Sequence, residues 1–346
     1  MARQNRFAQA LRLHSRFGSR LFATAALIAV LSPPTQAQQI GGCPVIPKPP
    51  SDLSLHLSVS GDQTVFRQGE IIALNAHYEA ETFRKYLLNN RSYDRSGRLN
   101  GMEVICIEPG SGTDPPADYF NSYQAFMGGG LFSEQELKWG PSTIRLELNE
   151  WRSLPPGSYM LSVVGNRANI GTEKDLHSWD SPPIQLQSNR IRFRVVEADP
   201  NWQKSQLAGA VRALDSPTST DGERLHAVRI LRFLGSEYST RELVRRYWSG
   251  QEKLVWDMEA GLFGSPFRAT AIREMRAALR AAHGEVREGF VETLVALELN
   301  SDPRHRPPQF DGNNAEIRER AFDAYEAERK NRVSIYMADV AAGTFR

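Results

Sequence analysis

The spacing of the apolar residues changes once along this chain, near Asp199-Pro200, and no other feature constrains the fold as strongly. Before this point apolar and polar residues alternate, as between Leu53 and Val59, which is typical of strands with one buried face. After it, apolar residues recur at i, i+3, i+4 and i+7, as between Leu207 and Leu214, which is typical of amphipathic helices. The sequence therefore predicts a multidomain β + α protein.

Residues 51–198 are expected to form the β domain. Alternating runs occur at 53–59, 72–78, 144–148 and 191–195, separated by segments rich in Pro, Gly and Ser. With three further β-rich segments they make about seven short strands, and no helical pattern lies between them. Such an arrangement predicts an antiparallel β-sandwich.

The segment "LPPGSYMLSV" describes one corner of this domain. Pro155-Pro156-Gly157 makes the turn, Tyr159 follows it, and Leu161 comes two positions later. Immunoglobulin-type sandwiches place a tyrosine at such a corner, with its hydroxyl bonded back to the preceding backbone. The segment resembles the bacterial immunoglobulin-like strand PG-x-Y-x-L-x-V, and "FRQGEIIALNAHY" extends the resemblance over roughly 51–197. It implies an immunoglobulin-like sandwich, with Tyr159 as a structural corner residue.

Residues 199–346 are expected to form an all-α domain. Asp199-Pro200 can cap and start its first helix, Gly235 can end the second, and Ser239 with Glu242 resembles a capping box for the third.

Two stretches of the helical domain are similar to each other. "HAVRILRFLGSEYSTRELVRRY" aligns with "TAIREMRAALRAAHGEVREGFVE" at an offset within the range of about 40 to 47 residues found in HEAT and armadillo proteins. The domain is interpreted as a HEAT-like repeat or, alternatively, a simple helical bundle. Its basic and acidic residues are balanced, which predicts a solvated surface of mixed sign for the arginines Arg229, Arg245, Arg246, Arg273 and Arg287.

The N-terminus has the features of a signal peptide, residues 1–37. Five arginines and no acid lie before Leu21, and "LFATAALIAVL" and "SPPTQAQ" follow. The apolar run is about half the ~20 residues of a membrane span, so no transmembrane span is expected after signal removal. The protein is expected to be exported to the periplasm or the extracellular space. Removing five arginines turns the formal net charge of +2 negative, and without a basic stripe no nucleic-acid binding is expected.

The two cysteines, Cys43 and Cys106, suggest one disulfide in an exported chain. Closing a loop of about 60 residues would stabilise the fold by about 4 kcal/mol in the chain-entropy model. It would tie the Pro-rich segment 38–50 to a strand. A lipoprotein anchored through Cys43 in "IGGC" is the less favoured alternative, because the apolar core ends too far upstream, at Leu31.

Residues 109–142 form a segment too long and too aromatic for a simple connection. It exceeds the ~12 to 15 residues above which an unstructured loop is unusual, and binding residues often lie on long loops of a rigid scaffold. The candidate binding residues are Tyr119, Tyr123, Phe126, Phe132 and Trp139. Alternatively, these rings and Phe120 cover one end of the sandwich or dock onto the helical domain.

Local catalytic motifs are absent from the sequence: it has no G-x-S-x-G, H-E-x-x-H, Walker or dinucleotide-binding pattern. His56 and His77 could lie together with Glu79 on one sheet face, a conceivable metal site, but exposed strand histidines are the favoured interpretation. No cofactor and no metal site is predicted. Glu150 and Trp151 are interpreted as corner residues rather than catalytic ones.

Two functions remain open. The favoured one is an exported, non-catalytic binding or scaffold protein with a protein partner in the cell envelope, and the layout resembles secreted bacterial proteins with an immunoglobulin-like sandwich followed by a HEAT-like domain. The alternative is a cell-envelope hydrolase or peptidase-related protein, whose carboxylates Asp114, Asp118 and Glu134 would meet only in the fold.

Overall fold

The computed structural model describes most of the chain beyond residue 42. The described residues are 43–91, 98–99, 101–121, 134–171, 183–250, 252–282, 286–306 and 315–346. All of them belong to one compact unit, Ala37–Arg346. The expected signal peptide, residues 1–37, lies outside the described residues, as do Tyr123, Phe126 and Phe132.

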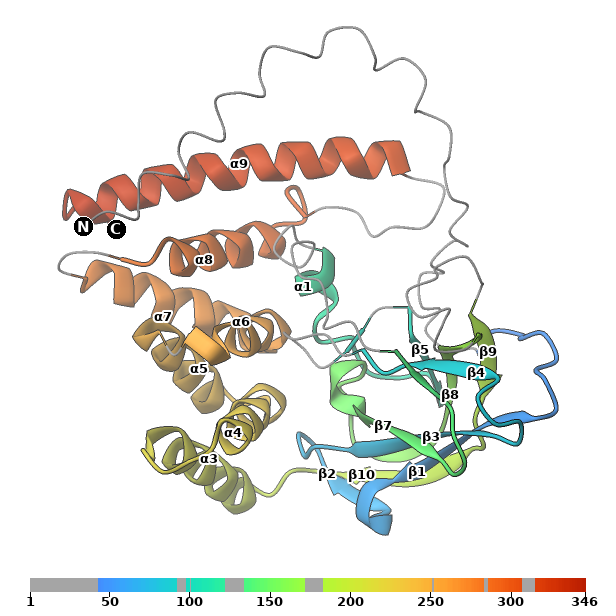
Figure 1. The fold of residues 1–346 in the computed structure, drawn as a ribbon. Coiled ribbons are helices and arrows are strands. Elements are labelled where there is room, and N and C mark those ends of the chain that lie inside the picture. Colours follow the sequence, from blue (N-terminus) through green and yellow to red (C-terminus); the bar gives the residue numbers. More distant parts are fainter. Residues whose placement is uncertain are drawn as a thin grey trace, which may run out of the picture. The chain divides into compact units, whose positions relative to one another are not determined.

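Strands occupy the first part of the chain and helices the second, so the β + α multidomain class is confirmed (Figure 1). The smaller sheet has three antiparallel strands in the order β1-β3-β7. Their bounds are β1 Leu53–Val59, β3 Ala73–Ala80 and β7 Ser142–Glu147.

The larger sheet has seven strands, built around the long strand β8, Gly157–Ile170. Its order is β2-β10-β8-β4-β6, and β5 and β9 also pair with β8. The other strands are β2 Val65–Arg67, β4 Tyr86–Asn89, β5 Glu103–Glu108, β6 Glu134–Glu136, β9 Ile184–Gln187 and β10 Ile191–Val196. The sheet is not wholly antiparallel, because β2 runs parallel to β10. The short helical turn Ser60–Asp62 takes the chain from β1 in one sheet to β2 in the other.

The two sheets share one hydrophobic core. Alternate residues of β1 and β3 point inward, so Leu57, Leu74 and Tyr78 are buried while His56 and His77 face outward. The core also contains the fully buried Trp151. Burying an indole of this size supplies a large apolar contribution to stability.

Tyr159 lies at the corner that leads into β8. Its hydroxyl donates a hydrogen bond to the Pro155 carbonyl at 2.7 Å and accepts one from the Ser111 hydroxyl at 3.2 Å. Its ring packs against Phe193, with 5.6 Å between centroids. The hydroxyl therefore fixes the turn that starts the central strand of the larger sheet.

Tyr159→Phe is expected to lower the free energy of unfolding by about 1 kcal/mol, because it removes the hydroxyl and leaves the Pro155 carbonyl without this donor. Urea unfolding measures the change. Tyr238→Phe, at an exposed tyrosine, is the matched control and should change nothing measurable. Equal stabilities for Tyr159→Phe and the wild type would show that the corner bond contributes nothing.

Apart from the short helix α1, Ala117–Asn121, the helices of the described residues follow from residue 200 onward (Figure 1, yellow to red). They are α3 Pro200–Asp215, α4 Asp221–Phe233, α5 Glu237–Ser249, α6 Val255–Gly264, α7 Arg268–Arg280, α8 Glu288–Ser301 and α9 Ala315–Ala341. Helices adjacent in sequence pack together, as α3 with α4 and α8 with α9, and α5 also packs against α7. They share a second hydrophobic core.

The helix starts agree in part with the sequence-based expectations. The Asp199 side chain accepts a hydrogen bond from the Trp202 N–H at 2.8 Å, and Pro200 is the first helical residue. The capping box of α5 is formed by Ser236 and Ser239, so the prediction of Ser239 with Glu242 was wrong. The helix begins three residues earlier than expected, which leaves the Glu242 side chain to bind arginines instead.

The outer edge of β1 carries an unusual substitute for a neighbouring strand. The side-chain amide of Asn189 accepts a hydrogen bond from the Leu57 N–H at 2.7 Å and donates one to the Leu57 carbonyl at 3.0 Å. An extended backbone residue in a paired strand would make the same two bonds. The edge of the smaller sheet is therefore closed at this position.

Cys43 and Cys106 form the predicted disulfide. It ties Cys43, the first residue that the structure describes, to β5 of the larger sheet. Within the ranges that the structure describes, no helix combines the length and apolar character that a membrane span needs, which fits the expectation for the chain after signal removal.

Candidate functional site

The candidate aromatic residues lie in different environments. Tyr119, on the short helix α1 Ala117–Asn121, is fully buried in the core of the helical part. Its ring centroid lies 5.5 Å from that of Phe263 on α6 and 5.6 Å from that of Phe120. Tyr119 thus docks the start of the long segment onto the helices, and it is not accessible to a partner.

Trp139 lies at the other end of the same segment and is 73% exposed. Its ring stacks on that of Phe83, which is 44% exposed, with 5.5 Å between centroids and 15° between planes. Phe83 precedes β4 and Trp139 follows β6, so the antiparallel pairing of these strands brings the two rings together. Two large aromatic side chains therefore lie stacked together on the surface.

A third exposed apolar side chain lies at the same end of the larger sheet. Ile170, the last residue of β8, is 60% exposed and is paired with Tyr86 at the start of β4. The Gly171 N–H also donates to the Lys85 carbonyl at 3.1 Å, which places the end of β8 beside the segment that carries Phe83. We call Phe83, Trp139 and Ile170 the aromatic edge patch.

Ion pairs surround the aromatic edge patch. The Arg84 guanidinium lies 5.9 Å from the centroid of the Phe83 ring and is paired with Glu136. Lys85 binds Asp52 at 2.8 Å, and the Tyr86 hydroxyl donates to the same carboxylate at 2.6 Å. These donors, Lys85 foremost, hold the pKa of Asp52 well below its usual range. The charged side chains next to the rings are thus held in defined positions.

The candidate aspartates Asp114 and Asp118 are each bound by arginine. Asp114 pairs with Arg98 at 2.6 Å. Asp118 pairs with Arg268 at 2.7 Å and also with Arg306, which anchors α1 to the helical part. Glu134 is the first residue of the edge strand β6. Each aspartate is therefore held by its own arginines.

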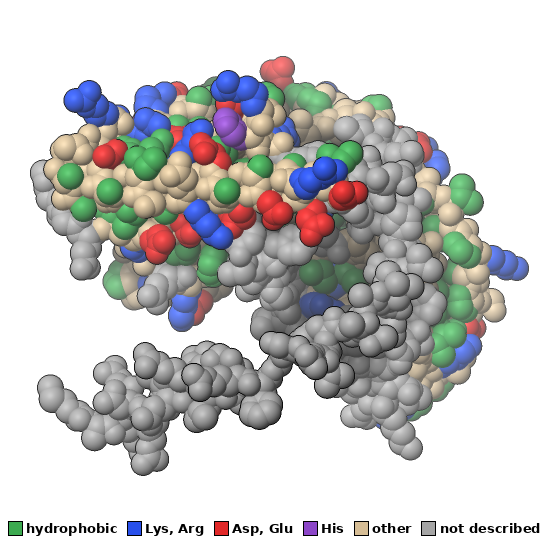
Figure 2. Space-filling model, turned by 90° about the horizontal axis from the view of Figure 1, so that it is seen from above, with side chains coloured by type: hydrophobic (Ala, Val, Ile, Leu, Met, Phe, Trp, Pro, Cys, Tyr) green, Lys and Arg blue, Asp and Glu red, His purple; other side chains and the backbone are tan. Residues whose placement is uncertain are grey.

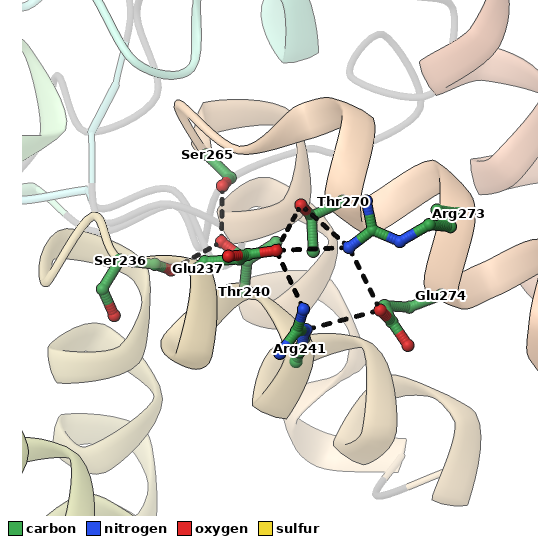
Figure 3. Close-up of polar contacts among 8 residues, drawn as sticks. All are labelled: Ser236, Glu237, Thr240, Arg241, Ser265, Thr270, Arg273 and Glu274. Atoms are coloured by element: carbon green, nitrogen blue, oxygen red, sulfur yellow. Dashed lines mark hydrogen bonds and ion pairs between the residues drawn. The ribbon is translucent and has the colours of Figure 1, made fainter.

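A polar cluster on the helical part joins α5 to α7 (Figure 3). The Glu237 carboxylate accepts hydrogen bonds from Arg241 at 2.9 Å and from Thr270 and Arg273 at 3.2 Å. These donors, Thr270 first, lower the pKa of Glu237. Glu274 adds ion pairs to both arginines, at 3.4 and 3.3 Å. The cluster fixes two helices to each other, and its arginines lie on the mixed-sign surface that the sequence predicts.

Two other arginines contradict the prediction of a solvated surface. Arg246 is buried and pairs with Asp215 and Glu242, both at 2.7 Å. Arg229 binds Glu147 across to the sheets at 3.1 Å. Arg245 and Arg273 do lie on the surface, with side chains 60% and 54% exposed. The face viewed from the side of α9 shows acidic and basic side chains interspersed (Figure 2).

Arg232, which was not among the residues singled out from the sequence, is buried. It is bound to Glu150 at 2.7 Å and to Asp257 at 3.1 Å. Burial raises the pKa of Glu150 to about 7 and that of Asp257 to about 6. The signal was present, since Arg232 follows Val228 by four positions and so falls on the buried stripe of α4. Glu150 remains a corner residue, but one that contacts a helix.

His56 and His77 lie directly opposite each other on β1 and β3, with ring centroids 6.4 Å apart. Both nitrogens of His77 are near hydroxyls, Nδ1 at 2.8 Å from Thr143 and Nε2 at 3.2 Å from Ser58. Among the described residues, no group of three or more His, Cys, Asp or Glu side chains could hold a metal ion. The pair forms part of a polar outer face.

Comparison with known proteins gives little for this chain. No family model matches it, and no curated protein matches it. A solved structure of E. coli alpha-2-macroglobulin in its native conformation is similar at 10% sequence identity, with a TM-score of 0.21. The match covers 84% of this chain and spans 22% of the length of that structure. A TM-score this low does not indicate a shared fold.

Proposed function

We propose that this protein is a non-catalytic binding or scaffold protein that contacts a protein partner through the aromatic edge patch. The exposure of Trp139 beside Phe83 carries the proposal. Interface residues that contribute most to affinity are enriched in Trp, Tyr and Arg and cluster together. Here an indole, a phenyl ring and the Arg84 guanidinium lie side by side.

The setting of the patch favours tight binding. Phe83 and Trp139 flank two paired strands, and Arg84 and Lys85 are held by Glu136 and Asp52. A surface whose side chains are already ordered loses less conformational entropy when a partner binds. Burial of the exposed rings would then add apolar stabilisation at about 25 cal/mol per Å².

We further propose an immunoglobulin-like sandwich for the two sheets and HEAT-like pairing for the helices. The hydroxyl bond from Tyr159 to Pro155 supports the first, because that family uses a tyrosine in this way. The two similar sequence stretches support the second, since one includes residues of both α4 and α5 and the other includes residues of both α7 and α8. Stacked helix pairs leave a broad face for contacts.

We also propose export to the periplasm or the extracellular space. The Cys43–Cys106 disulfide supports it, because structural disulfides persist in oxidising compartments. An exported scaffold with one aromatic contact site is the simplest function that unites these features. Asp114 and Asp118, each bound by arginine, support binding over hydrolysis.

Trp139→Ala is expected to weaken partner binding about 30-fold, the effect of losing 2 kcal/mol at a central interface residue. A photo-crosslinking amino acid at position 83 in the full chain identifies the partner, and titration of the purified pair gives the Kd. Tyr238→Ala is the control, because Tyr238 is 69% exposed but lies on α5. Equal affinity of Trp139→Ala and Tyr238→Ala for the captured partner would overturn the proposal.

A further inference from the structure

Five charged residues meet where the sheets contact the helices, and we call them the buried charge cluster. Glu147 ends β7, and Glu150 ends the helical turn Leu148–Glu150 that follows it. Arg229 and Arg232 lie on α4, and Asp257 lies on α6. Their contacts are the pairs Arg229–Glu147, Arg232–Glu150 and Arg232–Asp257. The cluster therefore links the sheets to the helices through ion pairs between side chains.

The centre of the cluster is almost inaccessible to water. The side chains of Glu150, Arg232 and Asp257 are 1%, 3% and 5% exposed. The Arg232 side chain also passes close to Gly261 of α6, where a Cβ atom would overlap its Cγ. Ionised groups in such surroundings are costly unless each is fully paired.

The charges of the cluster do not balance. Three carboxylates face two guanidinium groups, so full ionisation leaves one buried negative charge in excess. Glu150 and Asp257 both bind Arg232. Burial raises the pKa of both carboxyl groups, Arg232 and Arg229 lower it, and the neighbouring Glu147 raises it again. A bound proton on one of the two carboxyl groups would remove the excess charge.

Two further arginines lie close to the Glu150 main chain. Arg98 donates to the Glu150 main-chain carbonyl at 3.1 Å and pairs with Asp114 at 2.6 Å. Arg152 follows two residues later, and its guanidinium donates to the Trp151 carbonyl at 3.3 Å. The Glu150 Oε1 atom has no hydrogen-bond partner in the described part of the chain.

We propose that Glu150 and Asp257 share one proton around Arg232, and that uptake of this proton tightens the contact between the sheets and the helices on mild acidification. The device is independent of the binding site proposed above.

The direction of the pH effect follows from linkage. The pKa of Glu150 is raised from 4.5 to about 7, and that of Asp257 from 3.8 to about 6. The folded protein thus binds the proton more tightly than the unfolded chain, so its stability falls as pH rises from about 4 to about 7 and then levels off. The contact between sheets and helices is strongest below pH 6 and weakest above pH 7.

Glu150→Gln tests the device, because glutamine has the shape and the neutral charge of the protonated acid. Urea unfolding gives the equilibrium unfolding constant at pH 5.5 and at pH 8. The rise in this constant between the two pH values is expected to be at least tenfold larger for the wild type than for Glu150→Gln, because a pKa shift of one unit corresponds to a factor of ten. Glu237→Gln is the control: the lowered pKa of Glu237 places its titration below this pH range, so its pH dependence should match the wild type.

A second measurement needs no variant. The infrared spectrum of the wild type should show the carbonyl band of a buried protonated carboxyl group at pH 6, and this band should disappear by pH 8. Amide hydrogen exchange, corrected for its intrinsic pH dependence, should slow in α4 and in residues 148–151 on acidification. A wild type without the band and with the same pH dependence as Glu150→Gln would overturn the proposal.

Discussion

Replacing Arg232 with methionine is expected to lower the free energy of unfolding by about 3–5 kcal/mol at pH 8, the usual loss when one partner of a buried ion pair is removed. Methionine retains an apolar chain beside Gly261 but leaves Glu150 and Asp257 without their shared cation. Thermal or urea unfolding measures the loss. Part of the stability should return at pH 5.5, where both carboxyl groups can take up protons.

Arg241→Met is the matched control for this experiment. Arg241 is paired with Glu237 and Glu274 but is exposed on α5, and exposed pairs contribute about 0–1 kcal/mol. Adding Glu150→Gln and Asp257→Asn to Arg232→Met should recover much of the stability, because no unpaired charge remains. A similar loss from both single arginine variants would show that burial of the cluster has no energetic effect.

Removal of the disulfide by Cys43→Ser and Cys106→Ser is expected to destabilise the protein by about 4 kcal/mol in the chain-entropy model. The bridge joins residues separated by 63 positions, so its loss restores much freedom to the unfolded chain. At about 1.5 °C per kcal/mol for a chain of more than 300 residues, Tm should fall by roughly 6 °C.

Reductant supplies the control for the disulfide. It should lower the Tm of the wild type to that of the double serine variant and leave the variant unchanged. An identical Tm for the oxidised and reduced wild type would mean that the Cys43–Cys106 bridge adds nothing to the stability of the protein.

Hydrophobic spacing predicted the class of each part because it reports burial directly. The alternation in β1 and β3 and the stripe in α4 correspond to the buried faces observed. It could not predict β6, which has three polar residues and exists through its pairing with β4. Nor could it predict that β2 pairs in parallel with β10, since strand direction depends on where the chain changes sheets.

Only part of the candidate site was predicted, because contacts between separate segments decide which residues meet. Trp139 was singled out by its place in a long aromatic segment, but Phe83 was not, because a short strand pairing brings them together. Tyr119 was grouped with Trp139 by sequence and differs from it in burial, because contacts with Phe263 and the Asp118 ion pairs dock α1. Arg246 was expected on the surface because the helical part has balanced numbers of acidic and basic residues. Such a balance does not show which charged side chains are buried.

The amide of Asn189 has a consequence for how molecules of this protein behave at high concentration. By occupying both backbone groups of Leu57, it removes two bonding positions that an incoming chain would need to extend the smaller sheet. The Asn189 side chain thus opposes polymerisation through pairing of β1 with another molecule. The strand β1 has seven residues and lies at the edge of the smaller sheet. Because of Asn189, another chain cannot pair with the whole length of this strand.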